Sequence, residues 1–163
     1  MKWSKLKSEI EKRFCPILTH RVSIHSTAYG NCTCGHAWIT LDKVVIANFC
    51  TRAFLNTRPV FDQNTGKYVK DDISNIDNKK YKKQYVEYGE LSRQDLYKAC
   101  WEYLHNLSID EALKSDDPLI QTLAVIDSRV GTRRIKKINQ GKLHPLALKL
   151  LKERISMGNN NVN

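Results

Sequence analysis

The sequence lacks any long apolar run. Its first 14 residues hold no segment of the kind that a signal peptide needs, and no later stretch approaches the roughly 18 apolar residues of a membrane span. We therefore expect a cytoplasmic protein that makes no contact with a membrane. Thiols stay reduced in the cytosol, so the five cysteines predict no disulfide framework, and Cys15 and Cys100 are expected to pack as core thiols.

Familiar catalytic motifs are also missing. The chain contains no G-x-S-x-G, no P-loop, no H-E-x-x-H and no G-x-G-x-x-G. A metal-dependent nuclease would need clustered carboxylates, and the basic N-terminal half supplies few of them. These absences favour a protein without catalytic activity. An enzyme that depends on a thiol or a histidine stays open as a third alternative.

The order of the hydrophobic patterns predicts an α+β fold. Apolar residues recur at helical spacing in residues 1–14, and runs rich in branched and aromatic residues follow between residues 21 and 50. We expect an N-terminal helix and an antiparallel sheet of three strands, or slightly more, followed by a bundle of short C-terminal helices.

The length of 163 residues suits one domain, which we place at residues 1–157. It divides into a helix-plus-sheet part (1–55), a variable polar insertion (56–90) and a helical bundle (91–157). Within the insertion, Asn64-Thr65-Gly66 predicts a turn between two short strands, and the Lys79 to Lys83 run alternates with tyrosines that fit one face of a short helix. Residues 158–163 are expected to form a disordered tail.

The helical part carries clear start signals. Ser92 and Ser108 each precede an acidic residue by three positions, which is the pattern of a capping box. Asp117 before a proline opens a third helix, whose apolar stripe predicts an end at residue 131. Thr132 is expected to cap a basic turn, and the last helix begins at the His144-Pro145 step.

The net charge of +10 is concentrated at the C-terminal end. Residues 129–163 contain nine basic residues and one acidic residue, whereas residues 92–128 contain three basic and seven acidic residues. A basic surface attracts acidic proteins or phosphate backbones, and neighbouring acids neutralise part of it. The candidate binding residues are Arg129, Arg133, Arg134, Lys136 and Lys137.

A second candidate site lies on a predicted hairpin. Three thiols and one imidazole could hold a structural zinc, namely those of Cys32, Cys34, His36 and Cys50. The spacing of the first two cysteines is tighter than is usual for zinc. With a two-residue turn at Asp42-Lys43, Cys34 and His36 point away from Cys50, whereas a loop of three residues brings His36 opposite Cys50. Without zinc, no cofactor is expected.

Several segments together resemble an uncharacterised family of small bacterial cytosolic proteins. These segments are MKWSKLK, AWITLD, IANFCT and LSIDEALKSDDPLIQTLAVIDSRVGTRRIKKI followed by HPL. They cover both ends of the chain and leave residues 56–88 unmatched. The resemblance implies a bacterial cytosolic protein and carries no activity, ligand or catalytic residue.

Taken together, these patterns favour a non-enzymatic interaction protein. Its basic surface would bind an acidic protein partner, for example in an immunity or regulatory role. A nucleic-acid-binding module that contacts phosphates, with or without the zinc, is the alternative.

Overall fold

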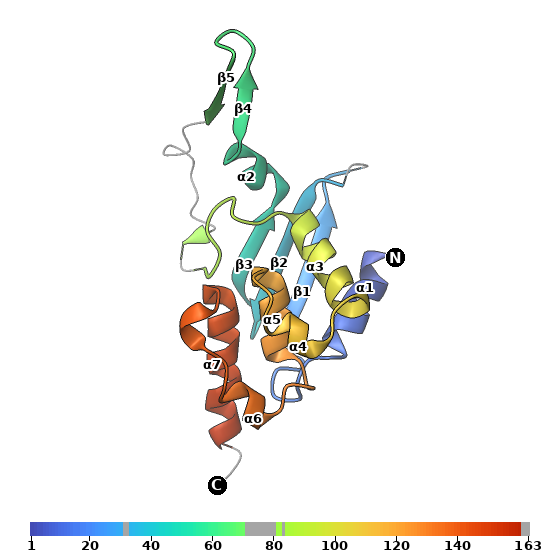
Figure 1. Cartoon of the computed structure of the whole chain (residues 1–163). Helices are drawn as coiled ribbons and strands as arrows, with labels where there is room; N and C mark the ends of the chain where they lie inside the picture. Colours follow the sequence, from blue (N-terminus) through green and yellow to red (C-terminus); the bar gives the residue numbers. More distant parts are fainter. Residues whose placement is uncertain (31–32, 71–80, 83, 161–163) are drawn as a thin grey trace.

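A three-stranded antiparallel sheet lies at the centre of the computed structural model (Figure 1). Helices α1 and α3 pack against this sheet, α5 packs against α3, and α7 packs against α5. The predicted α+β class is therefore confirmed, with one helix before the sheet and most helices after it. The structure describes residues 1–30, 33–70, 81–82 and 84–160.

The bounds of the elements follow the chain in order. The strands are β1 (Val22–Ala28), β2 (Gly35–Leu41), β3 (Val44–Cys50), β4 (Pro59–Asp62) and β5 (Lys67–Lys70). The helices are α1 (Trp3–Glu11), α2 (Thr51–Asn56), α3 (Arg93–His105), α4 (Ile109–Ala112), α5 (Pro118–Ile126), α6 (Thr132–Ile135), the 3₁₀ helix η2 (Gln140–Lys142) and α7 (Pro145–Asn160).

One face of the sheet is buried beneath the helices. Along β2, buried and half-buried residues alternate, as expected for a strand with one face in the core. The core also takes in most of α5, the apolar stripe of α7 and the two core thiols, Cys15 and Cys100. Burial raises the pKa of the Cys100 thiol to about 12, which keeps it protonated and unreactive.

The predicted helix starts are largely confirmed. Ser92 and Ser108 each form a reciprocal capping box, and the Asp117 carboxylate accepts hydrogen bonds from the backbone N–H groups of residues 119 and 120. The prediction for Thr132 is wrong, because Gly131 is the N-cap of α6 and Thr132 is the first helical residue. The His144 imidazole accepts a hydrogen bond from Leu146 N at the start of α7.

Helix α5 ends earlier than its apolar stripe predicts. It stops at Ile126 because the next residues leave the helix to pair with the segment after α1. Cys15 N donates to Ile126 O, and Ser128 N donates to Arg13 O, both at 2.8 Å. Val130 is still buried, so the stripe identified a core residue but not the end of the helix.

The hairpin between β2 and β3 combines a two-residue turn with a β-bulge. Asp42 and Lys43 both have positive φ, at 50° and 67°, as a type I′ turn requires. The register shifts after the Thr40–Val45 pair, leaving Ile46 without a partner on β2, and His36 then lies opposite Cys50. The prediction that this pairing needs a longer turn is therefore wrong, because the extra residue lies in the strand.

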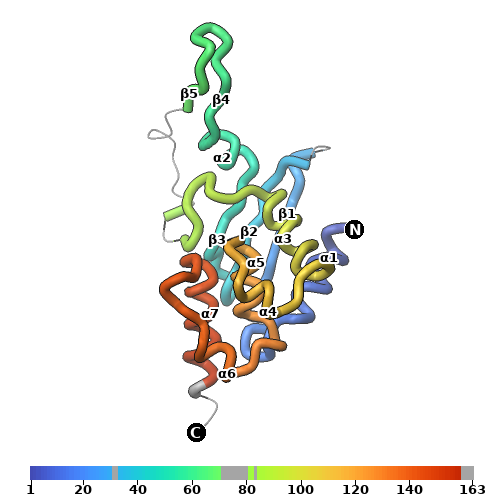
Figure 2. Tube along the Cα trace, in the orientation of Figure 1, coloured from blue at the N-terminus to red at the C-terminus, as the bar shows by residue number. Residues whose placement is uncertain are grey.

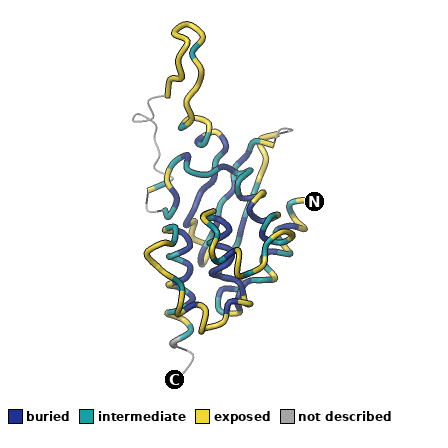
Figure 3. The backbone as a smooth tube through the Cα atoms, viewed as in Figure 1, coloured by how far each residue is buried: buried dark blue, intermediate teal, exposed yellow. Residues whose placement is uncertain are grey.

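Strands β4 and β5 form a hairpin that projects from the rest of the molecule (Figure 2). The predicted turn at residues 64–66 is confirmed, and the hairpin is almost entirely exposed (Figure 3). Most of the lysine run after it lies outside the described residues. No α-helix forms among the described residues from 81 to 88, where Tyr81 and Tyr88 instead meet edge to face, with ring centroids 5.1 Å apart.

The C-terminal helix extends further than expected. Helix α7 runs to Asn160, three residues into the stretch that the sequence predicts to be disordered. Residues 161–163 lie outside the described part of the chain. None of the described helices is long and apolar enough to span a membrane.

Candidate functional site

The basic segment predicted from the sequence lies on the short helix α6 and the turns on either side of it. Ile135 is buried and anchors the segment to the core, whereas Arg133, Arg134, Lys136 and Lys137 are exposed around it. Because α6 is a single helical turn with one buried residue, the cationic side chains around that residue are all exposed. The basic surface expected from the sequence is therefore present, but the basic residues that form it lie in different surroundings.

Arg129 differs from the others because it belongs to a partly buried polar network. Its guanidinium forms a two-pronged contact with the carboxylate of Asp127, at 3.0 Å from Nε and 2.9 Å from Nη2. The Tyr103 hydroxyl donates to the same carboxylate at 2.6 Å. Burial alone would raise the pKa of Asp127, but the hydrogen bonds from Arg129 and Tyr103 outweigh it and leave the pKa below its ordinary value.

A second arginine forms hydrogen bonds with the backbone that leads into the basic segment. Arg154 on α7 is buried and donates from Nη1 to the carbonyls of Val125 and Asp127, both at 2.8 Å, and from Nη2 to that of Val130 at 2.5 Å. One guanidinium thus donates to three carbonyls in the last turn of α5 and the segment that follows it. Arg154 fixes the path of the chain into α6.

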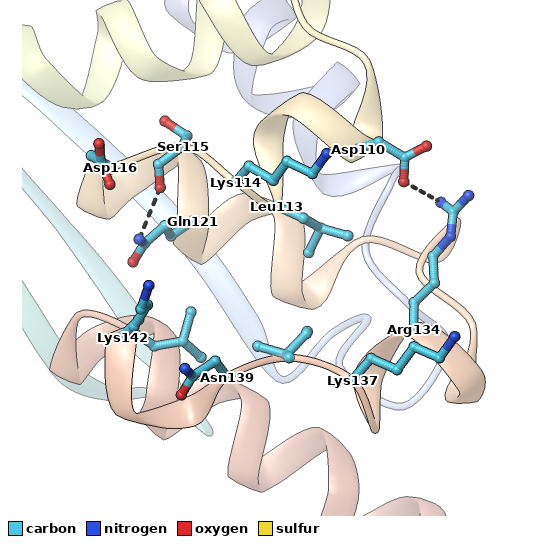
Figure 4. A pocket seen from close by; sticks show the side chains of 12 residues that line it. Asp110, Leu113, Lys114, Ser115, Asp116, Gln121, Arg134, Lys137, Asn139 and Lys142 are labelled. Atoms are coloured by element: carbon cyan, nitrogen blue, oxygen red, sulfur yellow. Dashed lines mark hydrogen bonds and ion pairs between the residues drawn. The ribbon is translucent and has the colours of Figure 1, made fainter.

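A cavity of about 600 Å³ separates the α4–α5 turn from the α6–η2 segment (Figure 4). Its wall carries four cations and two acidic residues. Its charged lining residues are Lys114, Arg134, Lys137, Lys142, Asp110 and Asp116. The surface is therefore basic in spite of the acidic character of the α3–α5 sequence.

The cations around the cavity differ in how they are neutralised. Arg134 lies 3.4 Å from an Asp110 carboxylate oxygen across the opening, and both side chains are about half exposed, so the pair stabilises little. Lys114, Lys137 and Lys142 are exposed and make no ion pair in the part of the chain that the structure describes. These three lysines are available to a ligand.

The floor of the cavity is apolar. Leu113, Ile138 and Leu143 line it and pack against the main core from the outer side. Gln121 Nε2 donates to Ser115 O at 2.8 Å, and Gln121 Oε1 accepts from His144 N at 3.1 Å, so that one side chain ties the two walls together. The cavity can accept a ligand that combines negative charge with an apolar group.

The structure brings together only part of the predicted basic set. Arg134 and Lys137 line the cavity, Arg133 and Lys136 are exposed outside the lining, and Arg129 is engaged with Asp127. Sequence reasoning did not connect Lys114 with the basic end, because Lys114 lies in a segment whose net charge is negative. Only the packing of α4 beside the 136–143 segment reveals it.

The second candidate site lies on the sheet face opposite the core. His36 is paired with Cys50 in the register, and His36 Nε2 is 2.5 Å from Asn48 Oδ1, whose amide donates to Gln84 at 3.0 Å. The Cys50 thiol and the Tyr29 hydroxyl are hydrogen-bonded at 3.3 Å. Burial, followed by this contact with Cys50, raises the pKa of Tyr29 to about 12.

The zinc hypothesis stays a prediction. Among the described residues, no group of three or more histidine, cysteine or acidic side chains is arranged to hold a metal ion. Cys34 precedes β2 directly, and Cys32 lies outside the described residues, so the predicted four-residue set is only partly on view. The histidines His25 and His36 instead flank Trp38, with ring centroids at 5.0 Å and 5.1 Å from it.

The comparisons with known proteins identify a family. The model of the SF0329 protein family, an uncharacterised family, matches residues 2–155, and the chain therefore belongs to it. This match runs through residues 56–88, which the motif-level resemblance leaves out. No curated protein and no solved structure matches the chain.

Proposed function

We propose that this member of the SF0329 family is a non-enzymatic binding protein whose basic cavity holds an acidic segment of a protein partner. A regulatory or immunity role toward that partner is the concrete form of the proposal. The observation that carries it is the pairing of three exposed lysines with an apolar floor in one cavity. The proposal includes that the protein is cytoplasmic and of bacterial origin.

The charge of the cavity supports an acidic ligand. Lys114 lies on one wall of the cavity, and Lys137 and Lys142 lie on the other, so that one extended acidic stretch between the walls would contact all of them. Each contact between an exposed lysine and a carboxylate contributes up to about 1 kcal/mol and weakens with salt. Charge alone would therefore give a weak and salt-sensitive complex.

The apolar floor supports a protein rather than a nucleic acid as the ligand. A phosphate backbone requires cations and hydrogen-bond donors, and it would leave Leu113, Ile138 and Leu143 without a use. A peptide can place one apolar side chain on this floor, which contributes about 2 kcal/mol. Acidic residues on either side of that side chain would then reach the lysines.

The test uses a labelled acidic peptide with one central leucine and follows its fluorescence anisotropy. We expect saturable binding that weakens about tenfold in the double variant Lys114→Ala/Lys142→Ala, since two exposed ion pairs are lost. The control variant, Lys98→Ala/Lys152→Ala, removes the same charge from exposed positions outside the cavity and should bind as the original chain does.

Two further ligands separate the alternatives. The same peptide with serine in place of leucine should bind more weakly, because it leaves the floor uncovered. A single-stranded oligonucleotide that binds more tightly than the peptide, with a steep loss of affinity as salt rises, would favour the nucleic-acid alternative instead. Equal losses in the cavity and control variants would mean that binding follows net charge and that the cavity is not the site.

A further inference from the structure

The hairpin formed by β4 and β5 exposes apolar side chains on both of its faces. In the register, Val60 lies opposite Val69 and Phe61 lies opposite Tyr68. Directly opposed residues share a face and successive residues alternate, so the valines lie on one face and the aromatic rings on the other. The exposed fractions are 58% for Val60, 48% for Val69, 50% for Phe61 and 74% for Tyr68.

These apolar side chains do not contribute to the core of the fold. Not one of the eight residues in the two strands is buried, and the hairpin extends beyond the body of the molecule (Figures 1 and 3). An isolated two-stranded hairpin is only marginally stable in water, and large apolar side chains on its two faces are costly to leave exposed. Their presence is explained if another molecule covers them.

The hairpin is nevertheless held in a defined shape. Asp62 accepts hydrogen bonds from Asn64 N at 2.9 Å and Thr65 Oγ1 at 2.8 Å, and Gly66 N donates to Asp62 O at 2.8 Å. Gly66 takes the positive φ of 64° that the loop needs. Because the shape is formed before binding, a partner pays little conformational entropy to order it.

The outer edges of the hairpin disfavour pairing with another strand. Pro59 lacks an N–H group on β4, and Lys67 and Lys70 are the first and last residues of the short strand β5. Prolines, lysines and short strands are the features by which natural edge strands resist strand addition. The faces are therefore the surfaces on which a partner can bind, rather than the edges.

The charge of the hairpin limits which kind of molecule can cover its two faces. Residues 58–70 contain the cations Arg58, Lys67 and Lys70 against Asp62 alone, and the whole chain carries a net charge of +10. A second copy would bring these like charges together. The valine face has no use for phosphates or for stacking on bases, which makes a nucleic acid a poor fit.

We propose that the β4–β5 hairpin is a docking arm that inserts, through both faces, into an apolar cleft bordered by acidic residues on a protein partner. The arm lies at the opposite end of the molecule from the basic cavity on α6 (Figure 1), so this inference does not depend on the function proposed for the cavity. The aromatic pair and the valine pair fill the cleft, and the lysines of β5 contact its acidic border.

The first experiment places a benzophenone amino acid at Tyr68 and irradiates the full-length protein in a lysate of its source organism. We expect a protein adduct that is absent when the same amino acid replaces Lys152, an exposed residue on α7. The captured protein is then purified and its Kd is measured directly. An adduct with nucleic acid, with a second copy of the chain, or within the same chain would overturn the proposal, as would no adduct beyond the control.

The second experiment uses variants of the arm with the purified partner. Phe61→Ser/Tyr68→Ser and Val60→Thr/Val69→Thr should each raise the Kd at least tenfold, because side chains at the centre of an interface dominate its affinity. Both variants should keep the original unfolding midpoint, since neither removes a buried side chain. An unchanged Kd in both, or a fall in the midpoint that accounts for the loss of binding, would refute the docking role. Lys98→Ala/Lys152→Ala, which changes exposed residues outside both the arm and the cavity, serves as the matched control and should leave this Kd unchanged.

Discussion

Replacing Arg154 by methionine tests how the helical layer is held together. Its guanidinium is buried and donates to three backbone carbonyls at 2.5–2.8 Å, from residues 125, 127 and 130. Methionine has a similar length and lacks donors, so Arg154→Met removes all three hydrogen bonds. The Asp127 carbonyl keeps the hydrogen bond that it accepts from Val130 N at 3.1 Å, whereas the carbonyls of Val125 and Val130 lose the guanidinium as their donor.

The magnitude follows from two opposing contributions. Each buried carbonyl left unsatisfied costs about 1–3 kcal/mol. Burial also lowers the pKa of Arg154, which shows that the folded state carries a desolvation cost that methionine removes. We therefore expect a net loss of about 3 kcal/mol, equivalent to about 6–12 °C in the unfolding midpoint of a domain of this size.

The assay is urea unfolding followed by circular dichroism, with thermal unfolding as a second measurement. Lys152→Met lies on the same helix at an exposed position and serves as the control, with an expected change within about 0.5 kcal/mol. Arg154→Lys should fall between the two, because one ammonium cannot reach all three carbonyls as well as a planar guanidinium does. A loss below about 1 kcal/mol in Arg154→Met would refute this account of the network.

Three further predictions concern the polar network and the sheet. Tyr103→Phe removes the hydroxyl that donates to the buried Asp127 carboxylate and should cost about 1–2 kcal/mol in urea unfolding. The folded pKa of Asp127 lies below its ordinary value. The contribution of this carboxylate to stability is therefore present above about pH 4 and is lost as the pH falls through the lowered pKa. In Asp127→Asn, this part of the acid dependence of unfolding should disappear. Gly35→Ala should lower the unfolding midpoint by several degrees, since the new Cβ would lie 2.1 Å from the Thr27 carbonyl oxygen, and an unchanged midpoint would contradict the close strand approach.

Local signals predicted much of the fold. The capping boxes at Ser92 and Ser108, the Asp117-Pro118 start and the turn at residues 64–66 each depend on neighbouring residues only, and all four are present in the structure. The three-stranded sheet also followed from short runs of branched residues. Where a hydrogen bond and its two partners lie within a few residues, the sequence alone is enough.

Features that depend on distant segments could not be predicted in this way. Helix α5 ends at Ile126 because the chain then pairs with residues 13–15, more than a hundred positions earlier. The bulge at Ile46 leaves no mark in a pattern of branched residues, and Arg154 resembles any other basic residue on an amphipathic helix. Each is determined by packing between segments that the sequence does not place side by side.

The candidate cavity illustrates the same limit. Segment 129–137 was identified by its charge, but charge did not reveal that Arg129 is engaged with Asp127 or that Lys114 faces the same opening. It also gave no indication of the apolar floor. The contribution of the sequence was to identify a basic end, and the tertiary structure turns part of it into a concave site.

In the β2–β3 hairpin, the bulge at Ile46 separates the length of the turn from the pairing register of the two strands, which are normally linked. In a regular hairpin, lengthening the turn by one residue moves every side chain of the second strand to the other face. Here the added residue lies inside β3, and its carbonyl accepts a hydrogen bond from Tyr85 N at 2.9 Å, which anchors the strand from its outer side. The pairing of His36 with Cys50 therefore depends on the bulge as well as on the length of the Asp42-Lys43 turn, and a turn one residue longer without the bulge would give the same pairing.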